Sequence, residues 1–189
     1  PVIFYNHADH MFWLGRSIAD KFADLRPNYK ITVNKRNIHD AFFLGVPMDA
    51  TVNHKSVKLA AKAKIGIPSD KKVILCVGSN FKLCKFKDKF FGNLLSELVK
   101  DKEDCLVVVL GIKNIDDNWL NVINNSNNKV ILRPPVQYDN GYFDYINAAD
   151  IIIDSWPMSG GTVMIDALSC DVPVLSLDNP IGQFDYLEN

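Results

Sequence analysis

Long apolar runs are missing from this chain of 189 residues. No stretch approaches the ~20 apolar residues that a membrane-spanning helix needs. The first residues also lack the basic region followed by an apolar region that marks a signal peptide. We therefore expect a cytoplasmic protein without a transmembrane segment, and these absences leave peripheral contact with a membrane open.

Arginine and paired cysteines are also scarce. Only four arginines occur and the net charge is −1, which argues against a nucleic-acid partner and favours a small molecule. The four cysteines are scattered and contain no Cys-x-x-Cys pair, so zinc and redox motifs are unsupported. The cysteines are Cys76, Cys84, Cys105 and Cys170.

What the chain does contain is an alternation of apolar runs with helical patterns from Lys71 onward. The runs lack a polar alternation, as expected for strands covered by helices on both faces. This order predicts an α/β fold with a doubly wound, Rossmann-like parallel sheet. The expected strands are 73–77, 106–110, 130–132, 151–153 and 172–177, and the expected helices are 87–100, 117–125, 142–149 and 162–170.

Residues 1–52 break this rhythm, so we expect them to be a fragment of a second α/β domain. Their pattern predicts a strand at 2–5, a long helix from Asp9 to Leu25 and strand-like runs at 30–33 and 41–46. A linker near Met48–His54 and a connecting helix at 55–64 would lead into the main domain, 53–189. Because neither end carries a start or stop signal, we expect a piece of a longer protein.

Two polar segments follow expected strands, and ligands of open parallel sheets bind beyond the carboxyl ends of the strands. Residues 154–162, DSWPMSGGT, open a helix with two glycines and several hydroxyls, which suits a diphosphate. Residues 78–85, GSNFKLCK, bring two lysines, Lys82 and Lys85, that can pair with phosphate. Taken alone, the first segment is equally well explained as a plain connection. The two lysines, taken alone, are better explained as solvated surface groups.

Residues 154–174 resemble the donor-site segment of glycosyltransferases of the GT-B fold. The shared pattern is Asp-x-x-Pro, Gly-Gly-Thr, Asp-Ala-Leu and Val-Pro-Val, preceded by 131–136. The segment is most similar to the O-linked N-acetylglucosamine transferase group and its bacterial relatives that glucosylate adhesins. The resemblance implies a nucleotide-sugar donor, expected to be UDP-linked, and a protein or glycan acceptor.

By this resemblance the diphosphate-binding threonine falls on Thr162 and the phosphate-neutralising lysine on Lys85. The family's His-Thr-Thr is Gly161-Thr162-Val163 here. No Asp-x-Asp or nearby Glu-x7-Glu pair occurs, so we expect an inverting transfer with no metal and no cofactor. The expected donor-binding residues are Ser79, Asn80, Lys82, Arg133, Pro135, Ser155, Ser159, Gly160, Gly161, Thr162 and Asp166.

On the acceptor side, His7, Asp9 and His10 cluster where a strand meets a helix. A group with a near-neutral pKa there suits proton transfer, so these residues and Lys85 are the candidate catalytic residues. An equally good interpretation is that Asp9 caps a helix and His7 satisfies a buried backbone group. A sugar-nucleotide epimerase of the same architecture and a noncatalytic nucleotide-sugar-binding module stay open as alternatives.

Overall fold

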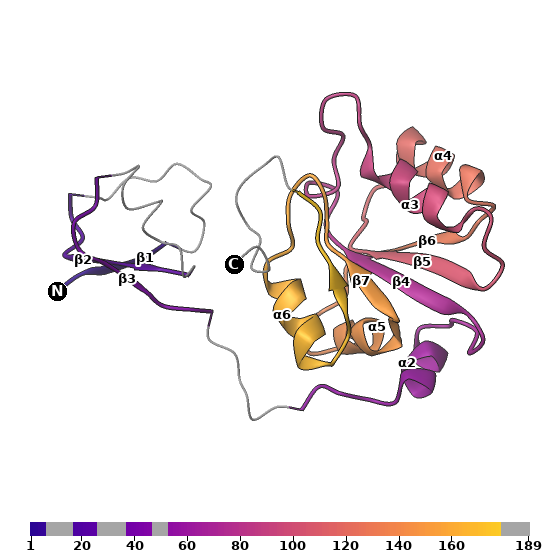
Figure 1. Cartoon of the computed structure of the whole chain (residues 1–189), viewed down its shortest axis with the longest axis horizontal. Coiled ribbons are helices and arrows are strands. Elements are labelled where there is room, and N and C mark those ends of the chain that lie inside the picture. Colours follow the sequence, from indigo (N-terminus) through magenta and orange to yellow (C-terminus); the bar gives the residue numbers. More distant parts are fainter. Residues whose placement is uncertain (7–16, 26–36, 47–52, 179–189) are drawn as a thin grey trace. The chain divides into compact units, whose positions relative to one another are not determined.

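The computed structural model describes residues 1–6, 17–25, 37–46 and 53–178. The chain divides into two compact units, Pro1–Val52 and Asn53–Asn189. Each unit has a parallel sheet of its own (Figure 1). The assignment of these units to acceptor and donor sides stays a prediction.

The first unit contains a three-stranded parallel sheet in the order β1-β2-β3. The strands are β1 Ile3–Asn6, β2 Lys21–Asp24 and β3 Ala41–Phe43. Strands therefore form within two of the expected runs, whereas the run at 30–33 lies outside the described residues.

The expected helix from Asp9 to Leu25 is wrong at its carboxyl end, where the chain forms β2 instead. This strand is the centre of the sheet and pairs with both neighbours, which buries Phe22 and Ala23. Pairing and burial on two sides outweigh the local helical spacing. The expected positions 9–16 lie outside the described residues.

The second unit contains a five-stranded parallel sheet in the order β6-β5-β4-β7-β8. This arrangement confirms the predicted α/β class and the doubly wound parallel sheet. The strands are β4 Lys72–Val77, β5 Cys105–Leu110, β6 Val130–Arg133, β7 Ile151–Ile153 and β8 Val174–Leu175.

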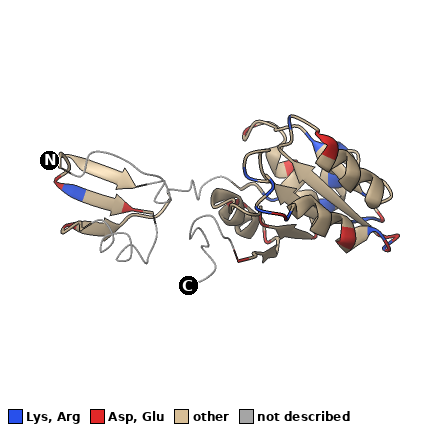
Figure 2. Cartoon of the chain, turned by 90° about the horizontal axis from the view of Figure 1, so that it is seen from above, with Lys and Arg blue, Asp and Glu red and all other residues tan. Residues whose placement is uncertain are grey.

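Helices cover both faces of this sheet, with α3 and α4 on one face and α2, α5 and α6 on the other (Figure 1). Apolar side chains fill both layers, and the charged residues lie mainly on helices and connecting loops (Figure 2). The helices are α2 Lys58–Lys64, α3 Phe91–Val99, α4 Asp117–Asn125, α5 Tyr142–Ala148 and α6 Thr162–Ser169.

One expected helix, 87–100, begins four residues late because a tight turn precedes it. Phe86 and Lys89 exchange two backbone hydrogen bonds, at 2.9 and 3.0 Å, and Lys87 lies in the left-handed region with φ 54°. These bonds hold the chain in a turn that a helix cannot include. The lysine-rich start of the expected helix is therefore part of the loop between β4 and α3.

The strand order reverses at β4, because the chain runs from β4 outward to β5 and β6 and then returns to β7 on the other side. In such sheets the loops on either side of the reversal part and leave a crevice at the carboxyl ends of the strands. Here those loops follow β4 and β7. The fold thus brings together the two polar segments that were predicted to bind a ligand, 78–85 and 154–162.

Candidate functional site

A cleft of about 640 Å³ lies at the carboxyl ends of β4, β5 and β6 and at the start of α6. Its volume falls in the range of small-molecule sites. Six of the expected donor-binding residues line it, namely Ser79, Asn80, Lys82, Pro135, Gly160 and Thr162. Phe81 and Val136 also line the cleft and lie in the predicted segments 78–85 and 131–136, whereas Gly111, Lys113, Asn114, Tyr142 and Val163 were not predicted as lining residues.

The loop after β7 is built around the buried carboxylate of Asp154. This carboxylate accepts 2.7 Å hydrogen bonds from the backbone N–H groups of Ser155 and Gly160, and one from the Ser159 hydroxyl. The Ser155 hydroxyl in turn donates to the carbonyl of Met158 at 2.7 Å. Ser155, Ser159 and Gly160 thus use these polar groups to shape the loop, and their direct contact with a donor stays a prediction.

The start of α6 supplies the exposed polar groups of the loop. Thr162 is exposed, and Gly161 precedes it with φ 39°. Within the described residues, neither the Gly161 nor the Thr162 N–H has a protein acceptor. Free N–H groups at a helix start attract anions, and the helix dipole adds to that attraction.

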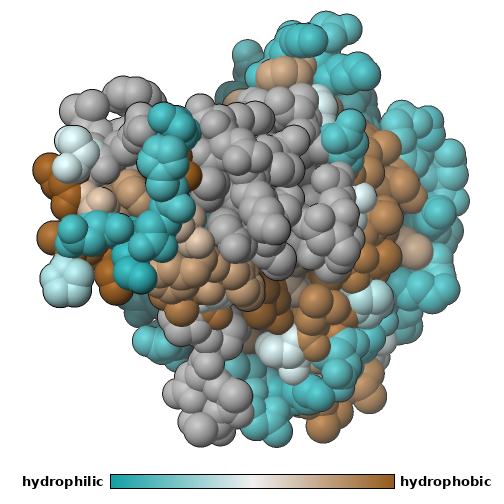
Figure 3. All heavy atoms as spheres, turned by 60° about the vertical axis from the view of Figure 1, so that its left-hand side comes forward, coloured by the Kyte–Doolittle hydropathy of each residue, from teal (hydrophilic) through white to brown (hydrophobic). Residues whose placement is uncertain are grey.

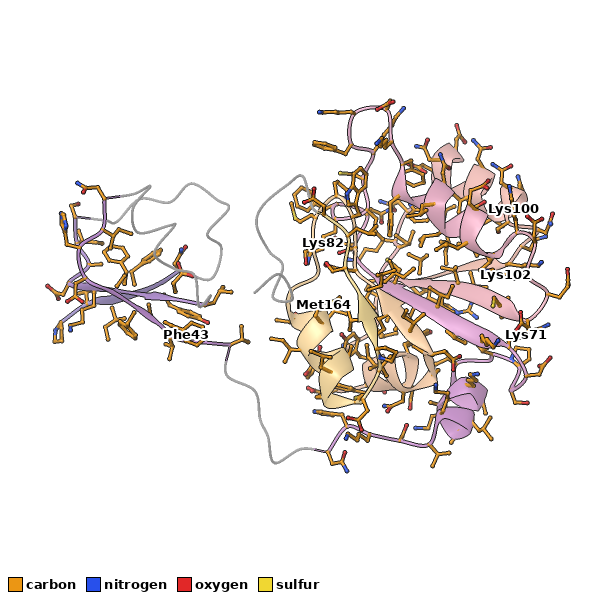
Figure 4. The ribbon with its side chains drawn as sticks, viewed as in Figure 1. Phe43, Lys71, Lys82, Lys100, Lys102 and Met164 are labelled. Atoms are coloured by element: carbon orange, nitrogen blue, oxygen red, sulfur yellow. The ribbon has the colours of Figure 1, made fainter. Side chains whose placement is uncertain are left out.

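Lys82 also lines the cleft, close to this loop (Figure 4). Its ammonium group lies 3.2 Å from the carbonyl oxygen of Ser159 and is half-buried. Burial lowers the pKa of Lys82, and the nearby Asp154 carboxylate opposes that shift. Lys85, the position that the family resemblance indicated, is exposed and does not line the cleft.

Asn80 joins the loop after β4 to the loop after β5. Its amide donates to the Asn114 carbonyl at 2.7 Å, and its side-chain oxygen accepts from the Lys113 N–H at 3.0 Å. Its side chain therefore holds the cleft wall in place. Ser79 is exposed beside it, and its carbonyl accepts from the Lys82 N–H at 2.9 Å.

Asp166 is buried under the cleft and is held by two tyrosines. The hydroxyl of Tyr138 donates to one carboxylate oxygen and that of Tyr142 to the other, both at 3.0 Å. Burial raises the pKa of Asp166, while these hydroxyls oppose the shift. Burial and the Asp166 carboxylate also raise the pKa of Tyr138 to about 12. Both carboxylate oxygens of Asp166 thus already have a tyrosine partner. Contact between Asp166 and a ribose stays a prediction.

The tyrosines are the partners that sequence reasoning missed. Tyr138 and Tyr142 stand four residues apart, and this spacing flanking the start of a helix was the available signal. Tyr142 also lines the cleft, so it links the cleft wall to Asp166.

Arg133 ends β6, and its carbonyl accepts the N–H groups of Gly111 and Ile112 at 2.9 and 3.0 Å. Its side chain is half-buried and is not among the residues that line the cleft, whereas Pro135 is. A role of Arg133 in orienting the donor therefore stays a prediction. His7, Asp9 and His10 lie outside the described residues.

The similarity of this chain to known proteins lies in its structure. No family model matches the chain, and no curated protein matches its sequence. Among the described residues, no helix has the length and apolarity to cross a bilayer.

The structural neighbours are GT-B glycosyltransferases. Anabaena HepE, crystallised with UDP and glucose, gives a TM-score of 0.69 at 13% identity, covering 93% of this chain and 52% of its own. WaaG, a glycosyltransferase of lipopolysaccharide biosynthesis, gives 0.63 at 18% identity, covering 82% and 44%. Sucrose-phosphate synthase from Thermosynechococcus elongatus gives 0.61 at 16% identity, covering 84% and 40%.

The chain therefore has the fold of part of a GT-B glycosyltransferase, and its second unit resembles the carboxyl-terminal domain of that fold. It spans about half the length of these neighbours. The described part does not single out the O-linked N-acetylglucosamine transferase group within the fold.

Proposed function

We propose that the second unit binds a nucleotide-sugar, with UDP as the expected nucleotide, and that the whole protein transfers its sugar to an acceptor. The proposal rests on one observation. Lys82 and the start of α6 line the same cleft, and the Lys82 ammonium lies next to the loop that leads into α6. Support comes from HepE, which has the same fold and was crystallised with UDP-glucose.

The diphosphate would lie between the Lys82 ammonium and the N–H groups of Gly161 and Thr162. A cation and a helix start are complementary to the phosphate charges, and partial burial strengthens both interactions. Among the described residues, the hydrogen-bond partner of the Lys82 ammonium is a carbonyl oxygen, at 3.2 Å. It would therefore gain a stronger, charge-assisted partner when a phosphate binds.

The nucleoside would lie along the wall formed by Pro135, Val136 and Tyr142. These residues follow β6 and open α5, and all three line the cleft. Apolar and aromatic faces suit a planar base, and this wall supplies both. This placement leaves the α6 start for the diphosphate.

For the transfer step, we propose an inverting displacement without a metal. An acceptor hydroxyl or amide forms a bond to the anomeric carbon while the bond from that carbon to the diphosphate oxygen breaks. The acceptor proton goes to a base on the acceptor side, for which His7, Asp9 and His10 are the candidates. Lys82 and the α6 start stabilise the departing diphosphate, and one such contact typically contributes ~2–4 kcal/mol to lowering the barrier.

Calorimetric titration of the chain with UDP, uridine and GDP tests the binding proposal. We expect UDP to bind and uridine to bind much more weakly, because the phosphates supply the charged contacts. Thr162→Val should weaken UDP binding, since it removes a hydroxyl at the α6 start, whereas Leu168→Ala, an exposed change on the same helix, should leave it unchanged. Equal affinities for UDP and uridine would place the phosphates elsewhere.

Product analysis on a full-length protein separates the functional classes. Transfer of the sugar to an acceptor supports the proposal, whereas conversion of the free nucleotide-sugar supports an epimerase. Binding without either reaction supports a noncatalytic module. We expect the present chain to bind a nucleotide without transferring sugar, because closure of two complete domains is needed to exclude water and align the acceptor.

A further inference from the structure

The loop between β4 and α3, residues 79–90, is strongly basic. It contains four lysines and one aspartate, so it carries a charge of +3 in a chain of net charge −1. Figure 1 shows that it rises from the end of β4 before returning to α3. Lys85, Lys87 and Lys89 are exposed on it, beyond the position of Lys82 in the cleft.

The exposed lysines of this loop differ from most others in the second unit by having no acidic partner. Lys85, Lys87 and Lys89 form no ion pair with any residue that the structure describes. Elsewhere in the unit, carboxylates lie within 4.0 Å of Lys55, Lys58, Lys62, Lys64, Lys71, Lys72, Lys100 and Lys129. The positive charge of the loop is therefore left for a partner outside the described chain.

Aromatic side chains alternate with these lysines. Phe81 is 71% exposed, and Phe86 is half-buried with its ring set edge-on to Trp156 at 5.9 Å. The Lys87 ammonium lies 5.5 Å from the Phe86 ring centroid. Figure 3 shows hydrophobic and hydrophilic residues side by side on the face in view. In the 79–90 loop the two kinds are neighbours in the sequence.

We propose that the 79–90 loop contacts a membrane surface that contains anionic lipids. Lysines are attracted to the charged headgroups, and exposed aromatic rings are stabilised at the boundary between water and lipid. Phe81 also lines the cleft, but it is 71% exposed, and a dissolved polyanion bound to the lysines would leave that exposed surface in water. The lipid surface accounts for both features, and the inference does not depend on nucleotide binding.

Flotation of the chain with vesicles of phosphatidylcholine, with or without phosphatidylglycerol, tests this inference. We expect binding only to the anionic vesicles and a loss of binding as salt rises. The double variant Lys87→Gln/Lys89→Gln should lower the partition coefficient about 25-fold, since each basic residue near such a surface contributes about fivefold. Phe81→Ser should lower it as well.

Lys100→Gln/Lys102→Gln is the matched control, because it removes two charges from the end of the unit opposite Lys82 (Figure 4). We expect it to leave vesicle binding unchanged. Equal losses in both double variants, or equal binding to neutral vesicles, would overturn the inference. So would binding to soluble polyphosphate that equals binding to anionic vesicles and is unaffected by Phe81→Ser, since that result assigns the loop to a dissolved polyanion.

UDP titration of the parent chain and the two double lysine variants separates this inference from the proposed function, and Phe81→Ser is left out because Phe81 lines the cleft. Lys87 and Lys89 do not line the cleft, so their double variant should bind UDP as the parent does. A chain that binds UDP but no anionic vesicles overturns the membrane contact alone. A chain that binds anionic vesicles but no UDP supports the membrane contact and overturns the proposed function.

Discussion

The hydroxyl of Tyr142 donates a 3.0 Å hydrogen bond to Asp166, which joins the first residue of α5 to the middle of α6. Tyr138 makes the matching bond to the other carboxylate oxygen. Since Tyr142 also lines the cleft, this pair connects the packing of the unit to the shape of its candidate site.

Replacement of Asp166 should destabilise the second unit in a pH-dependent way. Asp166→Ala leaves two tyrosine hydroxyls without their acceptor, at a cost of about 1–3 kcal/mol in the free energy of unfolding. Asp166→Asn should cost less, because it keeps one acceptor oxygen. Chemical denaturation followed by circular dichroism measures both variants.

The sign of the pH effect follows from the raised pKa of Asp166. The folded carboxyl holds its proton more tightly than the unfolded one, whose pKa is 3.8. Its contribution is therefore most stabilising below 3.8 and is lost as pH rises through the folded pKa. The parent chain should gain stability relative to Asp166→Asn as pH falls through this window, and a relative loss there would contradict the assigned burial.

Gly111→Ala should destabilise the chain more than Gly141→Ala. Both glycines have positive φ, 113° and 92°. A Cβ atom at position 111 would lie 2.6 Å from the carbonyl oxygen of Gly78, whereas one at 141 would meet nothing within 4 Å. Backbone strain of roughly 1–3 kcal/mol applies to both variants, so the difference in unfolding free energy isolates the clash. Equal losses would mean that β4 and β5 separate freely at this end.

Lys82→Met should weaken UDP binding more than Lys85→Met. Lys82 lies in the cleft beside the α6 start, whereas Lys85 is exposed outside its lining. Removal of a charged partner from a phosphate typically costs about 1.5–3 kcal/mol, or roughly tenfold to a hundredfold in affinity. Calorimetry at two salt concentrations measures the affinities. A larger effect at Lys85 would support the position indicated by family resemblance.

Asp150→Asn should lower stability at neutral pH by roughly 1 kcal/mol. Although burial by itself would raise the pKa of Asp150, the hydrogen bonds from Lys58 and the Val73 N–H hold it below its usual value. The stability from this carboxylate is present above the unfolded pKa of 3.8 and is lost as pH falls through the folded value.

Asp171→Asn is the control for Asp150→Asn. Asp171 pairs with Lys55, but its side chain is 76% exposed, so its loss should change stability by less than about 0.5 kcal/mol. Thermal unfolding between pH 2 and 7 compares the two variants with the parent. A similar pH dependence in both would assign the effect at Asp150 to net charge.

The strands and helices of the second unit were predictable because each has a strong local pattern. The uninterrupted apolar run at 106–110 predicts a buried strand, and the helical spacing of apolar residues at 117–125 predicts a helix. The failure at β2 has the opposite cause, since Phe22 becomes a strand residue only through neighbours that lie far along the chain. The late start of α3 depends on a turn whose lysines and phenylalanines also fit a helix.

For the candidate site, the sequence located the two main loops but not the partners of individual side chains. Sequence position alone does not show that Ser159 donates to Asp154, or that Lys82 rather than Lys85 reaches the cleft. Those outcomes depend on how the loop after β7 folds around one carboxylate. The contribution of the loop after β5 was foreseeable from the position of strand ends in parallel sheets.

The side-chain amide of Asn80 limits which sequence changes the cleft can accept. Because it spans from its own loop to the Asn114 carbonyl and the Lys113 N–H, the two loops have to keep matched lengths. An inserted residue in 111–114 would displace the acceptor by up to ~3.5 Å and break the bridge. Changes in ligand preference are therefore open to single substitutions at exposed lining positions such as Lys113, whereas insertions and deletions in these two loops would disrupt the cleft wall.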